Sequence, residues 1–429
     1  MSNIQYQKPR GTIDYFGLEL ENLKYIEEVI KNQAFLYGYS EIRTPIFEHT
    51  EVFVRSVGES SDIVTKEIYN FKDKGGRDIA LRPEGTAGVI RAINENKLLQ
   101  KQNWPLRVYY YGPIFRYERP QSGRARQFHQ FGFEILNTNN IFDDVDVILL
   151  AYSVIKKLNL KKYHLDINCI GSIETRRKWI DALKEYFSKY KEELSIDSQN
   201  RLQTNPLRIL DDKIDSQKDF VKNAPSIQSF LTQEEKDHFN KIKASLDALK
   251  IPYIQNLNLV RGLDYYTDLV FEFISELDEL KGQSTFCGGG RYNNLIEELG
   301  GIKAQAVGFA FGLERLLIQY LTENNITEKS HKKAYDLVLI NLLEDEFASL
   351  AIAYKLRDFN FSVYFEPSIK KLNQGFKLAE VYQVKFVLIL GTKEMQEGKI
   401  IVKNQVTMLQ ELVKIQDLYQ YLSSKLMDK

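Results

Sequence analysis

Apolar positions recur at helical spacing near the amino terminus and give way to other patterns further along the chain. In residues 12–38 apolar side chains return every three or four positions, which predicts a helix. Residues 40–48 then predict an extended segment that Pro45 interrupts. Residues 170–250 are charged, periodic at helical spacing and poor in glycine, and strand-like patterns resume only at 254–274. We therefore predict a helical insertion at 170–250.

The last hundred residues have a different pattern from the rest of the chain. Residues 322–333 are polar and aperiodic, so we place a domain boundary there and expect domains at 1–325 and 334–429. Beyond the boundary the predicted elements alternate: strand 335–342, helix 344–357, strand 361–365, helix 369–383 and strand 384–390. Such alternation predicts a small α/β domain with a largely parallel sheet.

Residues 107–137 predict a β-hairpin with a long polar connection. Successive side chains of a strand point to opposite faces. One face of the returning strand is apolar and is predicted to face the core, with Phe131, Phe133 and Ile135. The other face has Gln130, Gly132 and Glu134. We expect the glycine to leave room for a ligand that the two polar side chains contact.

The connection of this hairpin is rich in arginine. Residues 107–126 contain five arginines and one acidic residue, Glu118, which gives a local charge of +4. The planar guanidinium group of arginine suits phosphate oxygens. An arginine-rich loop can also be a solvated surface, so the segment alone leaves both interpretations open.

Three further clusters have polar or glycine-rich patterns. Glu84 and Thr86 could together hold an ammonium group, or Thr86 could cap the following helix. Residues 261–266, Arg-Gly-Leu-Asp-Tyr-Tyr, suit a site for a charged oxygen and a polar ring, or a turn followed by core aromatics. The glycines at 288–290 bring the backbone close to either a ligand or a neighbouring strand.

Residues 308–315 predict a strand that enters a helix with Arg315 at its start, although an ordinary tight connection would use the same glycines. Cys287 is expected to be a small packed residue, because no histidine accompanies it in a local motif.

Composition narrows the classes of protein that remain. The chain has 429 residues, with 58 basic and 58 acidic side chains, and its length predicts two or three domains. No apolar run has the length of a membrane span, and the amino terminus has no export signal, so we expect a cytoplasmic protein without membrane association. The two cysteines, Cys169 and Cys287, lack metal-site spacing. The zero net charge excludes only a uniformly basic protein.

Common nucleotide-binding and hydrolase motifs are absent from the sequence. It has no GxxxxGK[ST], no GxGxxG that opens a helix after a strand, no HExxH and no GxSxG. A bound nucleotide would therefore have to be held without a glycine cradle, and arginine is the obvious candidate.

These clusters in this order resemble the histidyl-tRNA synthetase family of class II aminoacyl-tRNA synthetases, over nearly the whole chain. Residues 39–53, the hairpin 107–137 and residues 308–316 resemble the three class II motifs. Residues 261–266 and 287–292 resemble two peptides peculiar to histidine enzymes, and 205–211 also matches the family. One departure is Asn293, where the family usually has aspartate, and we expect it to have little effect.

The resemblance implies an α+β fold: a class II antiparallel sheet with flanking helices, the helical insertion and a C-terminal α/β anticodon-binding domain. It also implies a homodimer, ATP as substrate with Mg²⁺, and a two-step reaction. L-Histidine attacks the α-phosphorus of ATP to give histidyl-adenylate and pyrophosphate, and tRNA(His) then takes the histidyl group.

The same resemblance assigns roles to individual residues. Arg261 and Arg116 are the implied catalytic residues, with Arg261 between the histidine carboxylate and the α-phosphate. The residues implied to bind ATP are Arg116, Glu118, Arg124 and Arg315. The residues implied to bind histidine are Glu84, Gly85, Thr86, Gln130, Glu134, Arg261, Tyr265, Tyr266 and Tyr292. Of these, Glu134 and Tyr266 would contact the imidazole. No metal ligand is assigned.

Two other functions compete with this one. The regulatory subunit of ATP phosphoribosyltransferase shares the catalytic fold, but it lacks the C-terminal domain and tends to lose the Arg-Gly-Leu-Asp-Tyr-Tyr peptide. A non-enzymatic nucleic-acid-binding protein could use the arginine-rich loop, but it would have no use for Glu84, Gln130 and Glu134.

Overall fold

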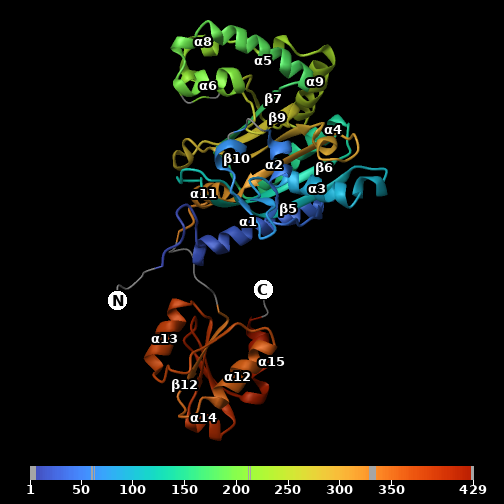
Figure 1. Ribbon diagram of the computed structural model, residues 1–429. Coiled ribbons are helices and arrows are strands. Elements are labelled where there is room, and N and C mark those ends of the chain that lie inside the picture. The colour runs from blue at the N-terminus through green and yellow to red at the C-terminus, as the bar shows by residue number, and fades with distance from the viewer. Residues whose placement is uncertain are drawn as a thin grey trace. The chain divides into compact units, whose positions relative to one another are not determined.

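The structure is a computed structural model that describes residues 6–58, 61, 63–210, 212, 214–327 and 335–426. The chain divides into a first unit, Met1–Asn325, and a second unit, Ile326–Lys429 (Figure 1). The predicted aperiodic segment 322–333 begins inside helix α11 (Leu313–Glu323), and its residues 328–333 lie outside the described part. Within the described part, no helix combines the length and the apolar character that crossing a bilayer requires.

An eight-stranded sheet is the centre of the first unit. Its strands, in spatial order, are β1 (Ser40–Glu41), β5 (Leu106–Phe115), β6 (Gln127–Leu136), β11 (Ala306–Gly312), β10 (Thr285–Tyr292), β9 (Thr267–Ser275), β7 (Tyr163–Cys169) and β8 (Ile254–Gln255). The six central strands are antiparallel, and the short edge strands β1 and β8 pair in parallel. The predicted hairpin is confirmed as β5 and β6, and the predicted antiparallel sheet with flanking helices is confirmed as well.

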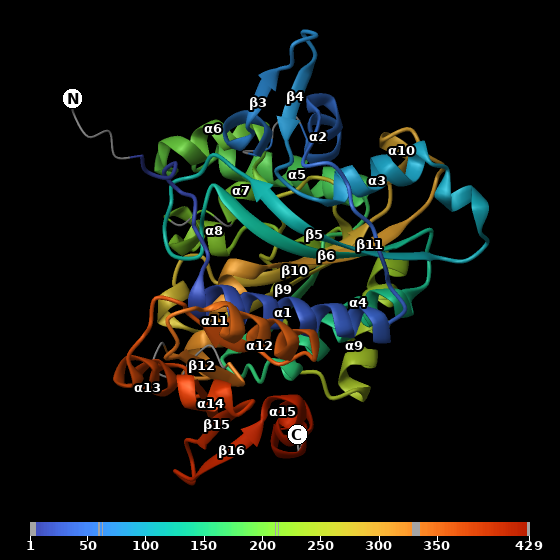
Figure 2. The same ribbon diagram turned by 90° about the horizontal axis from the view of Figure 1, so that it is seen from below.

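The two faces of this sheet have different covers (Figure 2). Helices α1 (Gly17–Leu36), α4 (Ile141–Lys157) and α11 cover one face, where Phe131, Phe133 and Ile135 are completely buried, as predicted. Helix α3 (Thr86–Glu95) covers part of the opposite face, beside α2 (Thr50–Val57) and the small sheet of β2 (Phe47–His49), β4 (Asp78–Leu81) and β3 (Asn70–Lys72). The polar side of β6 points to this second face.

Helix α1 starts five residues later than the periodicity predicts. Gly17 has a φ of +55°, a left-handed conformation that a continuous right-handed helix does not contain. Apolar spacing in residues 12–16 therefore belongs to an irregular segment that leads into the helix.

Helices occupy most of the segment between β7 and β8 (Figure 1). They are α5 (Ile173–Ser188), α6 (Ile196–Thr204), α7 (Leu207–Leu210), α8 (Asp219–Lys222) and α9 (Gln233–Ala248). Glu235 of α9 joins the starts of two helices, because it completes the capping box of α9 and accepts the backbone N–H of Ser172, the N-cap of α5, at 2.7 Å. We call these helices the insertion.

The second unit is a five-stranded sheet with helices. The strands, in spatial order, are β13 (Val363–Phe365), β12 (Leu337–Asn341), β14 (Phe386–Leu390), β15 (Lys399–Asn404) and β16 (Gln410–Lys414). The helices are α12 (Phe347–Asp358), α13 (Leu372–Val381), α14 (Thr392–Gln396) and α15 (Leu418–Leu426). The prediction of a largely parallel sheet is wrong, because β15 and β16 extend the parallel strands as an antiparallel hairpin that the sequence pattern did not reveal.

Candidate active site

A cavity of about 780 Å³ opens on the face of the large sheet that α1 and α4 leave free. Its walls come from the start of α3, strands β5, β6, β9, β10 and β11, the hairpin connection and the segment 261–266. Every residue that the sequence predicted for the site lines this cavity except Gly85. Segments far apart in the chain therefore converge on one site.

Gly85 lies beside the cavity and makes room for an aromatic ring. A Cβ atom at this position would lie 2.0 Å from the ring of Tyr110, so only glycine fits. Tyr110 in turn lines the cavity. The glycine thus acts on the site through Tyr110.

Glu134 is completely buried at the floor of the cavity and holds two hydroxyl groups. Its Oε1 accepts from Oγ1 of Thr86 at 2.9 Å, and its Oε2 accepts from the hydroxyl of Tyr292 at 2.5 Å. Burial raises the pKa of Glu134 to about 8, although these two hydrogen bonds oppose the rise. The raised pKa favours the protonated carboxyl group at neutral pH.

The contacts of Glu84 show which residue caps the start of helix α3. Its carboxylate accepts from the backbone N–H groups of Thr86 and Ala87, at 2.7 Å each. Glu84, and not Thr86, therefore satisfies the free donors at the start of α3, while the Thr86 hydroxyl turns to Glu134. Burial raises the pKa of Glu84 as well.

Several glycines at the floor of the cavity leave space that particular side chains or strands occupy. The expectation that Gly132 leaves room for a ligand is wrong, because a Cβ there would lie 2.1 Å from the Tyr110 ring, which occupies that space. A Cβ at Gly308 would lie 1.8 Å from Oε2 of Glu134. Among the three consecutive glycines, Gly288 faces the guanidinium of Arg261, and Gly289 and Gly290 face neighbouring strands.

Positive charge gathers in the same cavity. Arg116, Arg124, Arg261 and Arg315 all line it. The pKa of Arg315 falls to about 10, first because of burial and then because the other three arginines repel its charge. Glu118 forms an ion pair with Arg124, which offsets only part of this charge. Such a concentration of guanidinium groups is suited to a polyanion such as a nucleotide triphosphate.

The remaining arginines of the hairpin have other partners. Arg107 pairs with Asp143 and Asp146, Arg119 is exposed, and the guanidinium of Arg126 lies over the ring of Tyr117. Only part of the +4 charge of this segment therefore faces the cavity.

Arg261 is held between a carboxylate and an aromatic ring. It forms an ion pair with Glu272 on β9, which also accepts from the Thr285 hydroxyl at 2.6 Å. Its guanidinium lies 5.7 Å from the centre of the Tyr266 ring. Its Nε is buried without a hydrogen-bond partner.

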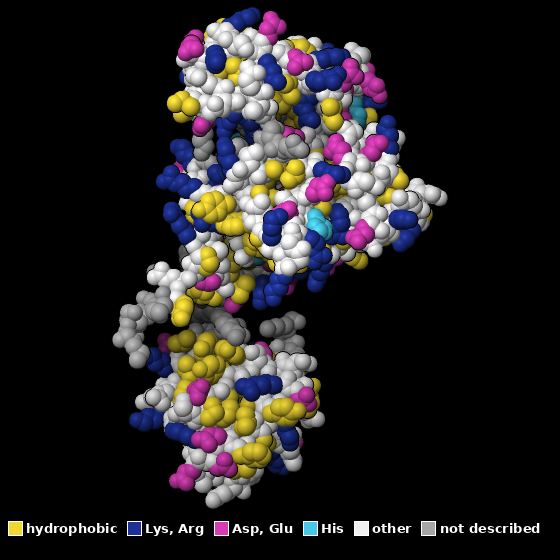
Figure 3. Space-filling model, viewed as in Figure 1, with side chains coloured by type: hydrophobic (Ala, Val, Ile, Leu, Met, Phe, Trp, Pro, Cys, Tyr) yellow, Lys and Arg dark blue, Asp and Glu magenta, His cyan; other side chains and the backbone are white. Residues whose placement is uncertain are grey.

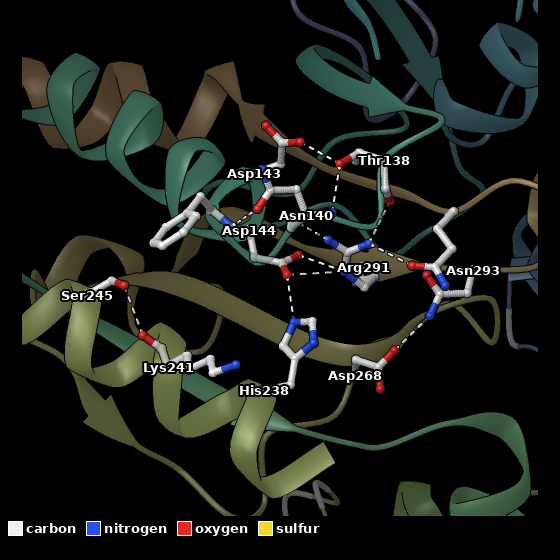
Figure 4. Close-up of polar contacts among 12 residues, drawn as sticks. Thr138, Asn140, Asp143, Asp144, His238, Lys241, Ser245, Asp268, Arg291 and Asn293 are labelled. Atoms are coloured by element: carbon white, nitrogen blue, oxygen red, sulfur yellow. Dashed lines mark hydrogen bonds and ion pairs between the residues drawn. The ribbon is translucent and has the colours of Figure 1, made fainter. Parts of the chain in front are cut away.

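Polar contacts on the side of β10 away from the cavity hold the strand that carries Tyr292 (Figure 4). Arg291, on the opposite face of β10, donates from Nε to Asp144 Oδ1 at 2.9 Å, and His238 of α9 contacts Oδ2 of the same carboxylate at 2.9 Å. The unusual Asn293 donates to Asp268 Oδ2 at 2.7 Å. An aspartate at 293 would place two carboxylates in contact, so asparagine suits this chain.

Sequence reasoning missed several residues of the site. Tyr110 lies opposite Gly132 in the β5–β6 register, and such a large–small pair is a signal that could have been used. Glu272 is an acidic residue with apolar neighbours on both sides in strand β9, which was a second signal. Arg201 and Arg208 reach the cavity from the insertion; Arg208 lies in the family-like segment 205–211, which was not assigned to the site, and no local pattern marks Arg201. Cys169 and Cys287 are both buried with raised thiol pKa values, consistent with packed residues.

The antiparallel sheet, with a buried polar pocket and clustered arginines in one cavity, defines a class II aminoacyl-tRNA synthetase. A search of solved structures supports this class. Apo histidyl-tRNA synthetase of S. aureus matches with a TM-score of 0.80 and 36% identity, covering 97% of this chain and 100% of that chain. A structure titled ATP phosphoribosyltransferase regulatory subunit/histidyl-tRNA synthetase from Bacillus halodurans matches at 22% identity and a TM-score of 0.64, which shows the shared fold.

The chain belongs to the histidyl-tRNA synthetase family. The model of that family matches residues 12–316, and a model described as an anticodon binding domain matches residues 336–425. The histidine–tRNA ligase of Malacoplasma penetrans is 48% identical over 96% of both chains. That of Bacillus velezensis is 43% identical over 98% of this chain and 99% of the relative.

Proposed function

We propose that this chain activates L-histidine with ATP to form histidyl-adenylate and pyrophosphate, and then transfers histidine to the 3′ end of tRNA(His). The observation that carries the proposal is Glu134. It is a buried carboxyl group at the floor of the cavity, flanked by hydroxyls and tyrosine rings, and the arginine cluster lines the same cavity. A small cationic or polar ring suits the carboxyl group, and a triphosphate suits the arginines.

Histidine is placed with its imidazole toward Glu134 and Tyr266, and Tyr265 and Tyr292 line the same end. An imidazole has two ring nitrogens that need polar partners, and a buried site of this kind rejects apolar rings because its own polar groups would stay unpaired. The amino group of histidine lies toward Glu84, Thr86 and Gln130. Its approach lowers the pKa of nearby buried carboxyl groups and favours their ionised form.

The arginines hold the triphosphate. Arg116 and Arg315 bind phosphate oxygens, with Arg124 and Glu118 at the edge of the same cluster. Arg261 lies between the histidine carboxylate and the α-phosphate, where negative charge accumulates as the carboxylate attacks. Catalysis then depends on position and charge, and no covalent intermediate on the protein is required.

Mg²⁺ accompanies the triphosphate in this proposal. Within the described residues, no cluster of three potential metal ligands exists. Mg²⁺ typically binds through one or two carboxylates together with substrate phosphates, so this finding fits an ion that arrives with ATP. Glu118, which borders the arginine cluster, would hold it together with the phosphates, and the ion would neutralise phosphate charge.

The tRNA reaches the protein through charged surface and through the second unit. Figure 3 shows lysine and arginine side chains along one edge of the first unit, below the insertion helices. The hairpin connection at 116–126 borders the cavity and suits the acceptor end. The second unit reads the anticodon, which the match to an anticodon binding domain supports.

The protein works as a cytoplasmic homodimer in this proposal. Ile46, Phe47 and Phe71 are exposed on or beside the small sheet of the first unit, near the segment that resembles the dimer-forming class II motif. Exposed apolar side chains that gather in this way are typical of an interface. Light scattering after size-exclusion chromatography should give twice the mass of the chain, and a monomer at micromolar concentration would exclude the dimer.

Charging of tRNA tests the proposal. The purified chain with ATP should attach labelled histidine to tRNA(His). Glu134→Ala should weaken histidine binding far more than ATP binding, because only the histidine end of the cavity changes. A folded wild-type protein that attaches no histidine would refute the function, and equal losses for both substrates would refute the role of Glu134.

A further inference from the structure

The segment 261–266 brings several side chains to the cavity, although it has no regular structure of its own. Arg261, Tyr265 and Tyr266 all line the cavity from this loop. A long backbone hydrogen bond, from Asp264 N to Val57 O at 3.3 Å, ties the loop to α2. Side chains that recognise a substrate must be held to about 0.5 Å, so further support is needed.

On the side of this loop that faces the insertion, packing contacts give little support. A second cavity of about 230 Å³ lies between this loop and helices α5 and α7 of the insertion, with Trp179 and Leu207 among its walls. Atoms that border a cavity lose dispersion contacts on that side. Directional bonds must therefore fix the loop there.

Arg176 of α5 provides these bonds. Its Nη2 donates to the carbonyl oxygen of Asp264 at 2.9 Å, and its Nη1 donates to the carbonyl oxygen of Tyr266. Hydrogen bonds from a charged guanidinium are stronger than neutral ones, and two of them from one planar group also fix orientation. Arg176 thus binds the backbone on either side of Tyr265.

The start of α5 is itself fixed, so Arg176 has a defined position. The hydroxyl of Ser172 accepts from Thr175 N at 3.3 Å, and Glu235 of α9 accepts from the Thr175 hydroxyl at 2.9 Å. The loop of the site therefore depends on the frame of the insertion helices.

The geometry points to Arg176 as a positioning residue for histidine recognition, which acts by fixing the loop that carries Arg261, Tyr265 and Tyr266. This inference rests on the proposed function. Without the guanidinium, the loop can shift toward the second cavity, and the histidine end of the site loses its shape. Arg116 and Arg315, which belong to other elements, keep their places, so ATP binding should change little.

Histidine-dependent exchange of labelled pyrophosphate into ATP, measured on the full-length chain, tests the inference. Arg176→Met keeps an unbranched apolar side chain and removes the donors. We expect it to raise KM for histidine at least about tenfold, the effect of losing a charge-assisted hydrogen bond, with KM for ATP changed by less than about twofold. The matched control is Arg177→Met, at the exposed next position of α5, which should leave both constants unchanged.

A double-mutant cycle with Tyr266→Phe separates positioning from a purely structural role. If Arg176 acts through Tyr266, the cost of Arg176→Met should shrink in the Tyr266→Phe background. Additive effects in this cycle would overturn the inference. So would an Arg176→Met variant that raises both KM values equally or leaves KM for histidine unchanged. If Arg176→Met does not fold, Arg176→Gln is measured instead, and a wild-type KM for histidine there overturns it. Wild-type protein without histidine-dependent exchange would instead refute the proposed function.

Discussion

Burial raises the pKa of Glu134 and its hydrogen bonds lower it, and the effect of burial is the larger. The result is a carboxyl group with a pKa of about 8 in a cavity proposed for a basic substrate. A neutral carboxyl group donates its own proton and keeps acceptor capacity on its oxygens, whereas a carboxylate only accepts hydrogen bonds and suits a cation. The protonation state of this residue is therefore linked both to ligand binding and to the stability of the fold.

The raised pKa of Glu134 gives a defined dependence of stability on pH. Its unfolded pKa is about 4.3, so between about pH 4 and 8 the unfolded chain has lost this proton while the folded chain keeps it. The folded state thus loses stability as pH rises through this range. Glu134→Gln does not titrate at this position, so it should gain stability relative to wild type between pH 5 and pH 8. Urea unfolding of both proteins at each pH measures this, and a pH-independent difference would contradict the pKa shift.

Arg261 is the residue on which the proposed chemistry depends most. Arg261→Ala should lower the rate of histidine activation by at least about a hundredfold, because it removes a donor to charge that develops in the transition state. The variant also leaves Glu272 without its ion-pair partner. Glu272→Gln is the matched control, since it breaks the ion pair but keeps the arginine, and single-turnover adenylate formation compares the two. Equal rate losses would show that Arg261 only neutralises Glu272.

At the scale of elements, the β5–β6 hairpin shows which features of the site the sequence predicts and which it does not. Alternation along β6 correctly separates the buried Phe131 and Phe133 from the polar side chains that face the cavity. It does not reveal which atoms face the glycines, because those neighbours belong to other strands. The sequence therefore predicted that Gly132 leaves room for a ligand, whereas the ring of Tyr110 occupies that space.

Other parts of the site were beyond sequence reasoning for the same reason. Arg176 contacts a carbonyl ninety positions away along the chain, and no local motif marks it. The hairpin of β15 and β16 was missed because the alternation of strands and helices before it favoured a parallel sheet. By contrast, the extended pattern and the helix start at 308–315 were found from local signals, as β11 and α11.

The packing of β11 against β6 gives a prediction at this scale. A Cβ at Gly308 would lie 1.8 Å from Glu134 Oε2 and 2.5 Å from the backbone oxygen of Phe133. Gly308→Ala should therefore lower the melting temperature by several degrees and weaken histidine binding, because Glu134 must move. Gly312→Ala in the same strand is the control for stability, since its nearest neighbour would lie 4.0 Å away. Equal melting temperatures for both variants would show that the strand adjusts freely.

For the whole molecule, the zero net charge conceals an uneven distribution. Six arginines line the cavity of the first unit, whereas residues 334–429 have 12 basic and 12 acidic side chains. Recognition of tRNA by the second unit must therefore rest on individually placed groups more than on a bulk field. The second unit also has its own hydrophobic core around Leu339 and Leu388, so the first unit can be studied without it.

Removal of the second unit should separate the two steps of the reaction. A chain of residues 1–327 keeps the cavity and its lining, so it should retain part of the histidine activation rate. Charging of tRNA(His) should fall steeply, because the proposed anticodon contact is lost. Both rates are measured on the same preparation. Normal charging by the truncated chain would contradict the role of the second unit.

The central claim is that the cavity joins histidine to the α-phosphate of ATP. Exchange of labelled pyrophosphate into ATP, with the full-length chain and one amino acid at a time, tests it most directly. The account predicts rapid exchange with L-histidine and negligible exchange with phenylalanine or glutamine, whose side chains leave polar groups of the site unpaired. A folded protein that shows no exchange with histidine, or equal exchange with the other amino acids, would contradict it.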